Sequence, residues 1–322
     1  MLNEHPVSDT RRPGVVAPAV VTETLPLWAC GLLGVAAALV GLLPWLATGM
    51  RLPIQNLWAV ETSPEAMPFV LLPFSQYSLS HVFGLIVTGS AAAGIVARAA
   101  RPRLPRGGFA LQFAGVLVVQ IAATVQTAVV VRSGLQERPE STLYLAVLVT
   151  LCILSILVGA GALALIARAP RAGALIGLTI GAIAVSEWIG VTLRPLTMMS
   201  VEWAYNVVGL FQWVTPVLVG IAIAWAGINT IGKIVGALAS LVLIWVAPAL
   251  MTGVGSAAGS YVLAHDPPAM IEYGLQVFQM ALFIPELALR PIIAAVVVAT
   301  IGFVVRWVLG RRQRSEEQHT GG

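Results

Sequence analysis

The sequence predicts an all-α fold: a polytopic integral membrane helical bundle of about eight transmembrane helices, with both termini cytoplasmic. The first observation is composition, because 58% of the 322 residues are hydrophobic and only 10% are charged, with a mean hydropathy of +0.90. A soluble domain is about 25% charged. The second is a series of apolar runs of about 20 residues, the length that crosses a bilayer core. The third is that arginines gather in alternate gaps between these runs, which is the positive-inside pattern.

A polar segment precedes the first apolar run. We predict that residues 1–25 are a cytoplasmic tail and not a cleavable signal peptide, because the first run, of about 20 residues, is too long for a signal sequence. Residues 26–309 form a single transmembrane domain, and residues 310–322 form a cytoplasmic C-terminal tail. The predicted spans are 26–47, 75–97, 109–131, 142–167, 173–192, 205–226, 234–252 and 287–309.

The arginine distribution predicts the orientation. With the N-terminus inside, most basic residues fall in the inner gaps and the tail, and the outer side receives only Arg51, Arg132, Arg138, Arg194 and Arg290. Seven spans would place the arginine-rich tail outside, so eight spans satisfy the rule. Of the 18 basic residues only Lys233 is a lysine, which suggests GC-rich bacterial coding. We therefore expect a multi-pass protein of a bacterial inner (plasma) membrane.

Two long segments are predicted to lie outside. Residues 48–74 are rich in proline yet apolar in places, so we expect them to rest on the membrane surface or to dip into the protein. Residues 253–286 begin with a Gly/Ser-rich loop and continue at 270–286 as an amphipathic, interfacial helix. The alternative, an additional span at 270–286, is short and would place the tail arginines outside. The inner gaps leave no room for a soluble catalytic domain.

Glu187 is the one acidic residue inside an apolar run. Ionisable groups are costly at such depth and often serve as proton or substrate sites. Its helix carries a small residue at every fourth position, namely Gly173, Gly177 and Gly181, which permits close packing of another helix. At 100° per residue Glu187 lies about 40° from this line and should face protein. The alternative is a structural carboxylate held by Arg194, Arg290 or Trp188.

Other polar residues in the runs are candidates for binding or transport. Gln120 and Gln126 share one helical arc with Gln112, Thr124 and Thr127, which either lines a polar path or supplies interhelical hydrogen bonds. Asn206 and Gln212 of the sixth span are candidate partners for them. Pro216 and Pro248 interrupt the sixth and seventh spans, a feature of transporter binding sites and of ordinary membrane helices alike.

Two further features lie near the outer ends of spans. His81 follows the polar stretch 75–80 and is a candidate ligand for a headgroup, a cation or a proton; the alternative is a solvated interfacial histidine. Glu286 and Arg290 are four residues apart, the spacing of a helical ion pair, and should fix the start of the last span. Cys30 and Cys152 are expected to be small buried side chains. We predict no metal site and no cofactor.

Three functional hypotheses follow. The first is a transporter or permease-like protein for a small or lipid-like solute, proton-coupled through Glu187. The second is a non-catalytic subunit or scaffold of a cell-envelope complex that docks through its outer loops. The third is an outer-face enzyme acting on a lipid-linked substrate, with Glu187, His81 or Glu61 as acid or base; it is the least favoured, because no paired catalytic motif occurs.

The expected partners follow from the same patterns. The lipid bilayer surrounds the chain, and a membrane protein or a second copy of the chain could pack on the glycine stripe. No nucleic acid is expected, because the aromatic residues lie in apolar runs and not among the basic residues.

Overall fold

The computed structural model describes residues 24–197, 201–260 and 266–320, so most of the predicted tail 1–25 lies outside the described residues. The described residues are 81% helical and contain no strand, and eight helical segments among them are long and apolar enough to cross a membrane. The prediction of an all-α polytopic bundle with eight spans is confirmed.

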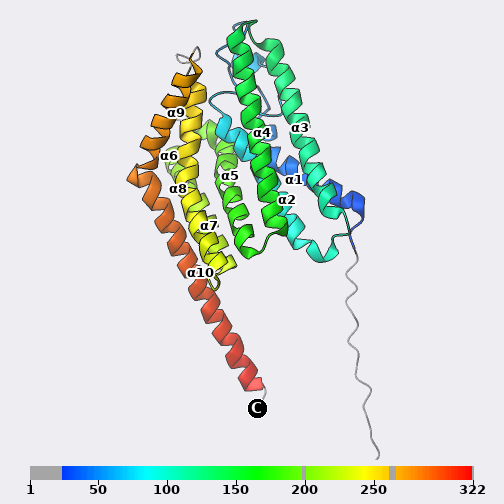
Figure 1. Ribbon diagram of the computed structural model, residues 1–322, viewed down its shortest axis with the longest axis vertical. Helices are drawn as coiled ribbons and strands as arrows, with labels where there is room; N and C mark the ends of the chain where they lie inside the picture. The colour runs from blue at the N-terminus through cyan, green and yellow to red at the C-terminus, as the bar shows by residue number, and fades with distance from the viewer. Residues whose placement is uncertain (1–23, 198–200, 261–265, 321–322) are drawn as a thin grey trace, which may run out of the picture.

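The helices follow one another with short connections (Figure 1). They are α1 (Leu27–Ala47), α2 (Leu79–Ala99), α3 (Gly108–Gly134), α4 (Pro139–Arg168), α5 (Arg171–Thr197), α6 (Glu202–Phe211), α7 (Val214–Ala226), α8 (Ile231–Gly259), α9 (Pro267–Leu282) and α10 (Pro285–Thr320). Two 3₁₀ turns, η1 (Pro64–Ala66) and η2 (Arg101–Arg103), lie in connections. The sixth span consists of α6 and α7, which are separated by a break at residues 212–213.

The two ends of the bundle differ. One end, which we call the loop end, carries residues 48–78 between α1 and α2 and also helix α9 (Figure 1). The other, which we call the arginine end, carries the α2–α3, α4–α5 and α7–α8 connections. The first described residue and the last helix both extend from the arginine end (Figure 1). An even number of spans requires this arrangement.

Helices α2 and α5 are the most enclosed of the spans. Each packs against α1, α4 and the other, and α5 also contacts α7 and α8. In the 18-residue apolar stretch of each helix, 61% of the residues are buried in α2 and 50% in α5, whereas 11% are buried in α10. Helices α1–α4 therefore lie on one side of α5, and α7, α8 and α10 lie on the other.

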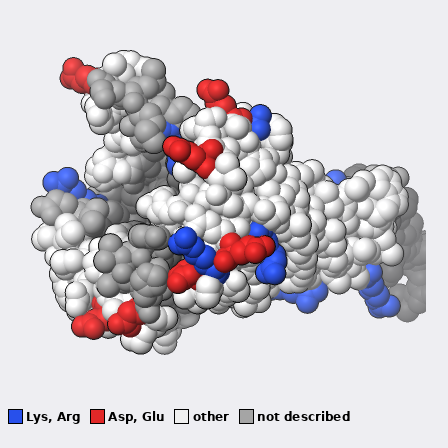
Figure 2. All heavy atoms as spheres, turned by 90° about the horizontal axis from the view of Figure 1, so that it is seen from above, with Lys and Arg blue, Asp and Glu red and all other residues white. Residues whose placement is uncertain are grey.

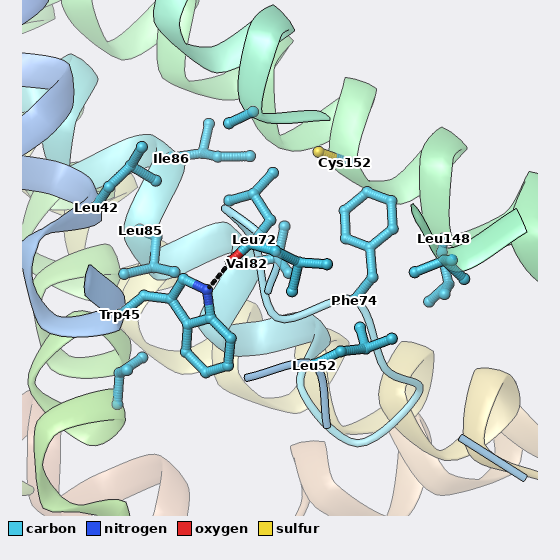
Figure 3. Close-up of a cluster of buried hydrophobic side chains, with 14 of the residues drawn as sticks. Leu42, Trp45, Leu52, Leu72, Phe74, Val82, Leu85, Ile86, Leu148 and Cys152 are labelled. Atoms are coloured by element: carbon cyan, nitrogen blue, oxygen red, sulfur yellow. Dashed lines mark hydrogen bonds between the residues drawn. The ribbon is translucent and has the colours of Figure 1, made fainter. Parts of the chain in front are cut away.

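The segment 48–78 folds into the loop end. Leu72 and Phe74 are fully enclosed, and they pack with Trp45 and Leu148 beneath the loop (Figure 3). The Trp45 indole donates a hydrogen bond of 2.9 Å to the Val70 carbonyl. Two short antiparallel bridges, Arg51–Phe69 and Trp58–Leu135, close the segment on itself and on the α3–α4 connection. The apolar residues of this segment thus make a lid that dips into the protein.

Two side chains of helix α3 bind the backbone of this lid. The amide of Leu71 donates to the Gln126 side-chain oxygen at 2.9 Å, and the amide of Leu72 donates to the Thr127 hydroxyl at 3.0 Å. Because buried amides need a partner, these two side chains take the place of a neighbouring strand.

The substitution Thr127→Val should loosen the lid. It keeps the shape of the side chain but leaves the buried Leu72 amide without its acceptor, which costs roughly 1–3 kcal/mol. We expect faster hydrogen exchange at residues 70–74 and a lower melting temperature. Thr300→Val is the matched control, because the Thr300 hydroxyl bonds only its own helix at Val296. Equal exchange in both variants would contradict this role of Thr127.

The predicted outer loop 253–286 needs a correction. Residues 253–259 are the last two turns of α8 and not a loop. Gly253 serves packing, because a Cβ on it would lie 2.8 Å from the Gly274 carbonyl of α9. The helix predicted at 270–286 corresponds to α9, which begins at Pro267 and ends at Leu282; the Asp266 side chain accepts from the Ala269 amide and caps its first turn. It falls outside the eight apolar spans.

Arginines at the arginine end cap the ends of helices. Arg98 of α2 donates to the carbonyls of Ile166 and Ala169 at 2.7 and 3.1 Å, and Arg101 donates to Ala167. These carbonyls close α4, where the last turn lacks helical donors. Arg306 of α10 binds the carbonyl of Ala224 near the end of α7 in the same way. The arginines therefore stabilise helix ends as well as marking one side.

Candidate functional site

A cavity of about 460 Å³ lies in the half of the bundle near the loop end, where α2, α5, α6, α7, α8 and α10 meet. Its polar lining consists of His81, Ser186, Glu187, Arg194, Gln212 and Thr215. The structure thus brings together three predicted candidates: His81 of α2, Glu187 of α5, and Gln212 in the break between α6 and α7.

Two glycines create the closest contact in this site. A Cβ built on Gly84 of α2 would lie 2.7 Å from both the Glu187 Cβ and the Trp188 amide nitrogen of α5. A Cβ on Gly190 of α5 would lie 3.6 Å from the His81 Nε2. Because Gly84 and Gly190 have no side chains, α2 and α5 approach each other closely here. His81 of α2 and Glu187 of α5 therefore lie at the border of the same cavity.

Glu187 is half-buried, and its hydrogen-bond partner is the Ser80 side chain of α2. Arg194 lies two turns further along α5, donates to the Ser78 hydroxyl at 3.3 Å, and is near enough to act electrostatically on His81. The acid, the imidazole and the guanidinium therefore face a common space. A site with both signs of charge can bind a dipolar or ionisable solute and can move a proton.

The Trp188 indole binds the backbone of α1 and not the Glu187 carboxyl. It donates to the carbonyls of Val40 and Gly41 at 3.2 and 2.9 Å. Val40 lies four residues before Pro44 in α1, and a proline leaves that carbonyl without its helical donor. The Trp188 indole replaces the missing donor and ties α1 to α5 beside the cavity.

Three prolines line the cavity from three helices: Pro216 of α7, Pro248 of α8 and Pro291 of α10. Pro248 and Pro291 lie inside their helices, so each removes one helical hydrogen bond and frees the backbone carbonyl four residues earlier, which for Pro248 is that of Ile244. Pro216 lies in the first turn of α7, where the backbone nitrogen has no helical acceptor to lose. The break between α6 and α7 lies at the same level. Helices that are interrupted at the depth of a charged group can line a binding site for a solute.

Hydroxyl pairs close the cavity toward the centre of the bundle. The Ser186 and Thr215 hydroxyls lie 2.6 Å apart and join α5 to α7, and Thr215 also donates to the Ala182 carbonyl. One turn below Ala182, the Thr179 hydroxyl donates to Ser240 of α8 at 2.8 Å. These hydrogen bonds join α5 to α7, which contains Pro216, and to α8, which contains Pro248.

The other predicted binding residues lie elsewhere. Gln120 donates to the Ile86 carbonyl and the Ser90 hydroxyl, both at 2.9 Å, and holds α3 on α2. Gln126 binds the lid at Leu71 and Phe69. Asn206 is exposed on α6. Gln120 thus joins two helices and Gln126 joins a helix to the lid, and neither side chain borders the cavity of Glu187.

The predicted structural residues are also placed. Gly177 approaches Ile166 of α4 and Gly181 approaches Ala91 of α2, so these glycines pack within the chain. Gly173 lies against Ala169 in the preceding connection. Arg290 is exposed on α10, and the side chain of Glu286 lies outside the described residues. In the described part of the chain, no three His, Cys, Asp or Glu side chains gather as a metal site.

Sequence reasoning missed Ser186, Thr215 and Pro291 as members of this site. It named Arg194 only as a possible structural partner of Glu187, although Arg194 follows Glu187 by seven residues and so lies on the same helical face. Pro291 had no usable signal, since its place beside Pro216 and Pro248 depends on how α10 packs. No protein-family model, no curated protein and no solved structure matches this chain.

Proposed function

We propose that this protein is a permease that carries a small or lipid-like solute through the Glu187 cavity and exchanges a proton at Glu187. The observation that supports this most is the convergence of Glu187, His81 and Arg194 on one cavity that three proline-containing helices border. Its volume of about 460 Å³ falls within the range of small-molecule sites. In this proposal the loop end faces outward, in keeping with the arginine distribution.

The charges favour a class of solute. Arg194 offers a planar guanidinium, which suits a carboxylate or a phosphate. Glu187, bonded to Ser80, can neutralise a cationic group on the same solute or take up a proton when the solute leaves. A solute with an acidic group, carried together with a proton, matches both residues.

A second candidate is an enzyme at the outer face that acts on a lipid-linked substrate. The nearness of His81 to Glu187 favours it, because an imidazole and a carboxyl can share acid–base work. The scaffold hypothesis predicts a bundle without a polar cavity, and no feature of this site favours it.

The permease and the enzyme differ in access to the cavity. We expect a cysteine at position 186, introduced by Ser186→Cys, to react with a membrane-impermeant maleimide from the loop end and, under an opposed pH gradient, from the arginine end. Wild-type protein in proteoliposomes supplies the background, since Cys30 and Cys152 are buried. Ser155→Cys is the matched control, because Ser155 is a buried serine of α4 away from the cavity.

Glu187→Gln links this access to the proton. The amide keeps the shape of the carboxyl but cannot titrate, so the labelling rate at position 186 should lose its dependence on pH. Access from one end under every gradient would favour the enzyme. No reaction at position 186 under any condition, or a pH dependence that survives Glu187→Gln, would contradict the permease.

A further inference from the structure

A second, larger hollow lies at the loop end between α4 and the α8–α9 hairpin. It has a volume of about 560 Å³ and an almost wholly apolar lining that includes Leu143, Val147, Val254, Leu275 and Phe278. We call it the apolar groove. The lining also includes Ile271 of α9, whose side chain is 72% exposed. The groove therefore opens beside surface that suits lipid chains better than water.

A polar chamber of about 450 Å³ adjoins the apolar groove. Gln76 and Ser260 line both spaces. The chamber lies between the start of α2 and the Gly/Ser-rich turns of α8, and its hydroxyl groups come from Tyr77, Ser80, Thr252, Ser256 and Tyr273. No charged residue occurs among the described residues that line it. An apolar space joined to a hydroxyl-lined one is complementary to a molecule with a long apolar tail and an uncharged polar head.

Gln76 supplies an independent sign of a missing ligand. Its side chain is only 8% exposed, and among the described residues its Nε2 amide has no hydrogen-bond partner. A buried amide without a partner costs roughly 1–3 kcal/mol. Because Gln76 lines both spaces, an oxygen atom at the junction of tail and head would accept its hydrogen. An ester carbonyl or a glycosidic oxygen occupies that position in a lipid.

We propose that the apolar groove and the polar chamber together bind one lipid with an uncharged, oxygen-rich head, of acylglycerol or glycolipid chemistry. The acyl chain lies along α4 and α8–α9, the head hydroxyls meet those of α2 and α8, and the Gln76 amide donates to the oxygen that joins them. A phosphate head fits poorly, because the described lining offers it no cation. The polar chamber adjoins the Glu187 cavity at Met251 and Ser80, but lipid binding does not require transport, so the inference holds whether or not the protein is a permease.

Photolabelling tests the site. The probe is a diacylglycerol with a diazirine on one acyl chain, placed in phosphatidylcholine vesicles with the full-length protein; a monoglycosyl diacylglycerol and a phosphatidylglycerol that carry the same diazirine form two further arms. Labelled peptides are identified by mass spectrometry. We expect labelling to concentrate on the α8–α9 peptides that contain Val254 and Phe278, relative to the lipid-facing surface of α10 in the same molecule.

Two variants should remove this enrichment. Gln76→Leu loses the donor and should lower it about fivefold or more, the equivalent of roughly 1 kcal/mol for one hydrogen bond. Val254→Trp fills the apolar groove and should abolish it. The controls are Gln136→Leu, since Gln136 binds Trp58 outside the site, and Leu157→Trp on the exposed face of α4.

The outcomes separate clearly. Enrichment with either uncharged lipid, and its loss in both site variants but not in the controls, supports the proposal, and the stronger arm names the head. Equal or stronger enrichment with phosphatidylglycerol would overturn the head-group chemistry. Even labelling of all lipid-facing peptides, unchanged by Gln76→Leu and Val254→Trp, would overturn the site itself.

Discussion

The substitution Gly84→Leu should separate α2 from α5, lower the melting temperature of the bundle and disrupt the Glu187 cavity. Even a Cβ at this position would lie 2.7 Å from the Trp188 amide nitrogen, and backbone cannot move aside as the end of a side chain can. Overpacking of a well-filled interior typically costs 1–3 kcal/mol, and here the two most enclosed spans must part. We therefore expect one of the largest losses of stability at this position.

The functional effect has the same cause. When α2 moves away from α5, the Ser80 side chain leaves Glu187 and His81 leaves Gly190. In the cysteine assay, the pH-dependent labelling at position 186 should disappear together with part of the stability. The melting temperature in detergent and the labelling rate in proteoliposomes measure the two effects.

Gly161→Leu is the matched control for this glycine. Gly161 lies in a span, α4, but nothing lies within 4 Å of a Cβ built on it. It should leave the melting temperature and the labelling near wild type. If both variants lowered stability equally, close packing at the α2–α5 crossing would not be the cause, because Gly161 lies outside that crossing.

The substitution Arg98→Leu should destabilise the arginine end far more than Arg103→Leu. Arg98 donates to two carbonyls that close α4 and lies 5.1 Å from the Trp225 ring. Hydrogen bonds from charged groups contribute about 1.5–3 kcal/mol each, and some is lost to solvent because Arg98 is only half-buried, so we expect a loss of roughly 2–4 kcal/mol. Arg103 is an exposed neighbour.

This comparison separates two roles of one residue type. Both variants remove one positive charge from the same connection, so both weaken the positive-inside signal equally. Only Arg98→Leu removes the cap of α4. Denaturant unfolding measures the stability, and cysteine accessibility at residues 104–107 measures the orientation. Equal loss of stability in the two variants would refute the capping role of Arg98.

Much of the architecture could be predicted from composition. The apolar runs locate eight spans because a membrane excludes unpaired backbone over a fixed thickness. The predicted C-terminal boundary of α8 was wrong because glycine and serine at 253–260 resemble a turn. The role of Gly253 depends on Gly274, which is distant in sequence and allows α9 to pack closely on this end of α8. Local composition cannot carry this information.

The site could be predicted only in part. Glu187 was found because an acid inside an apolar run is costly anywhere in a membrane. The partners of Gln120 and Gln126 could not be predicted, because both side chains bind backbone groups, and every residue carries the same backbone groups. The spacing of Arg194 and Glu187 along α5 is readable from the sequence, but the place of Pro291 in the same site arises from packing between helices. The importance of Gly84 appears only when Trp188 is placed against it.

The helices also differ in length, and the membrane must respond to this. Helices α1 and α2 have 21 residues each, whereas α4 has 30 and α8 has 29. At 1.5 Å per residue the first pair extends about 32 Å and the second about 44 Å, against a hydrocarbon core of about 30 Å. Figure 2 shows wide uncharged areas between the charged side chains at the loop end.

The hydrophobic mismatch therefore varies around the bundle. Lipids beside α1 meet a short wall, whereas lipids beside α4 and α8 meet a tall one. We expect the surrounding bilayer to thin along α1 and to thicken along α4 and α8, or the whole molecule to tilt. Because α4 and α8 pack on opposite sides of α5, a change in acyl-chain length should act as a mechanical load on both halves of the bundle at once.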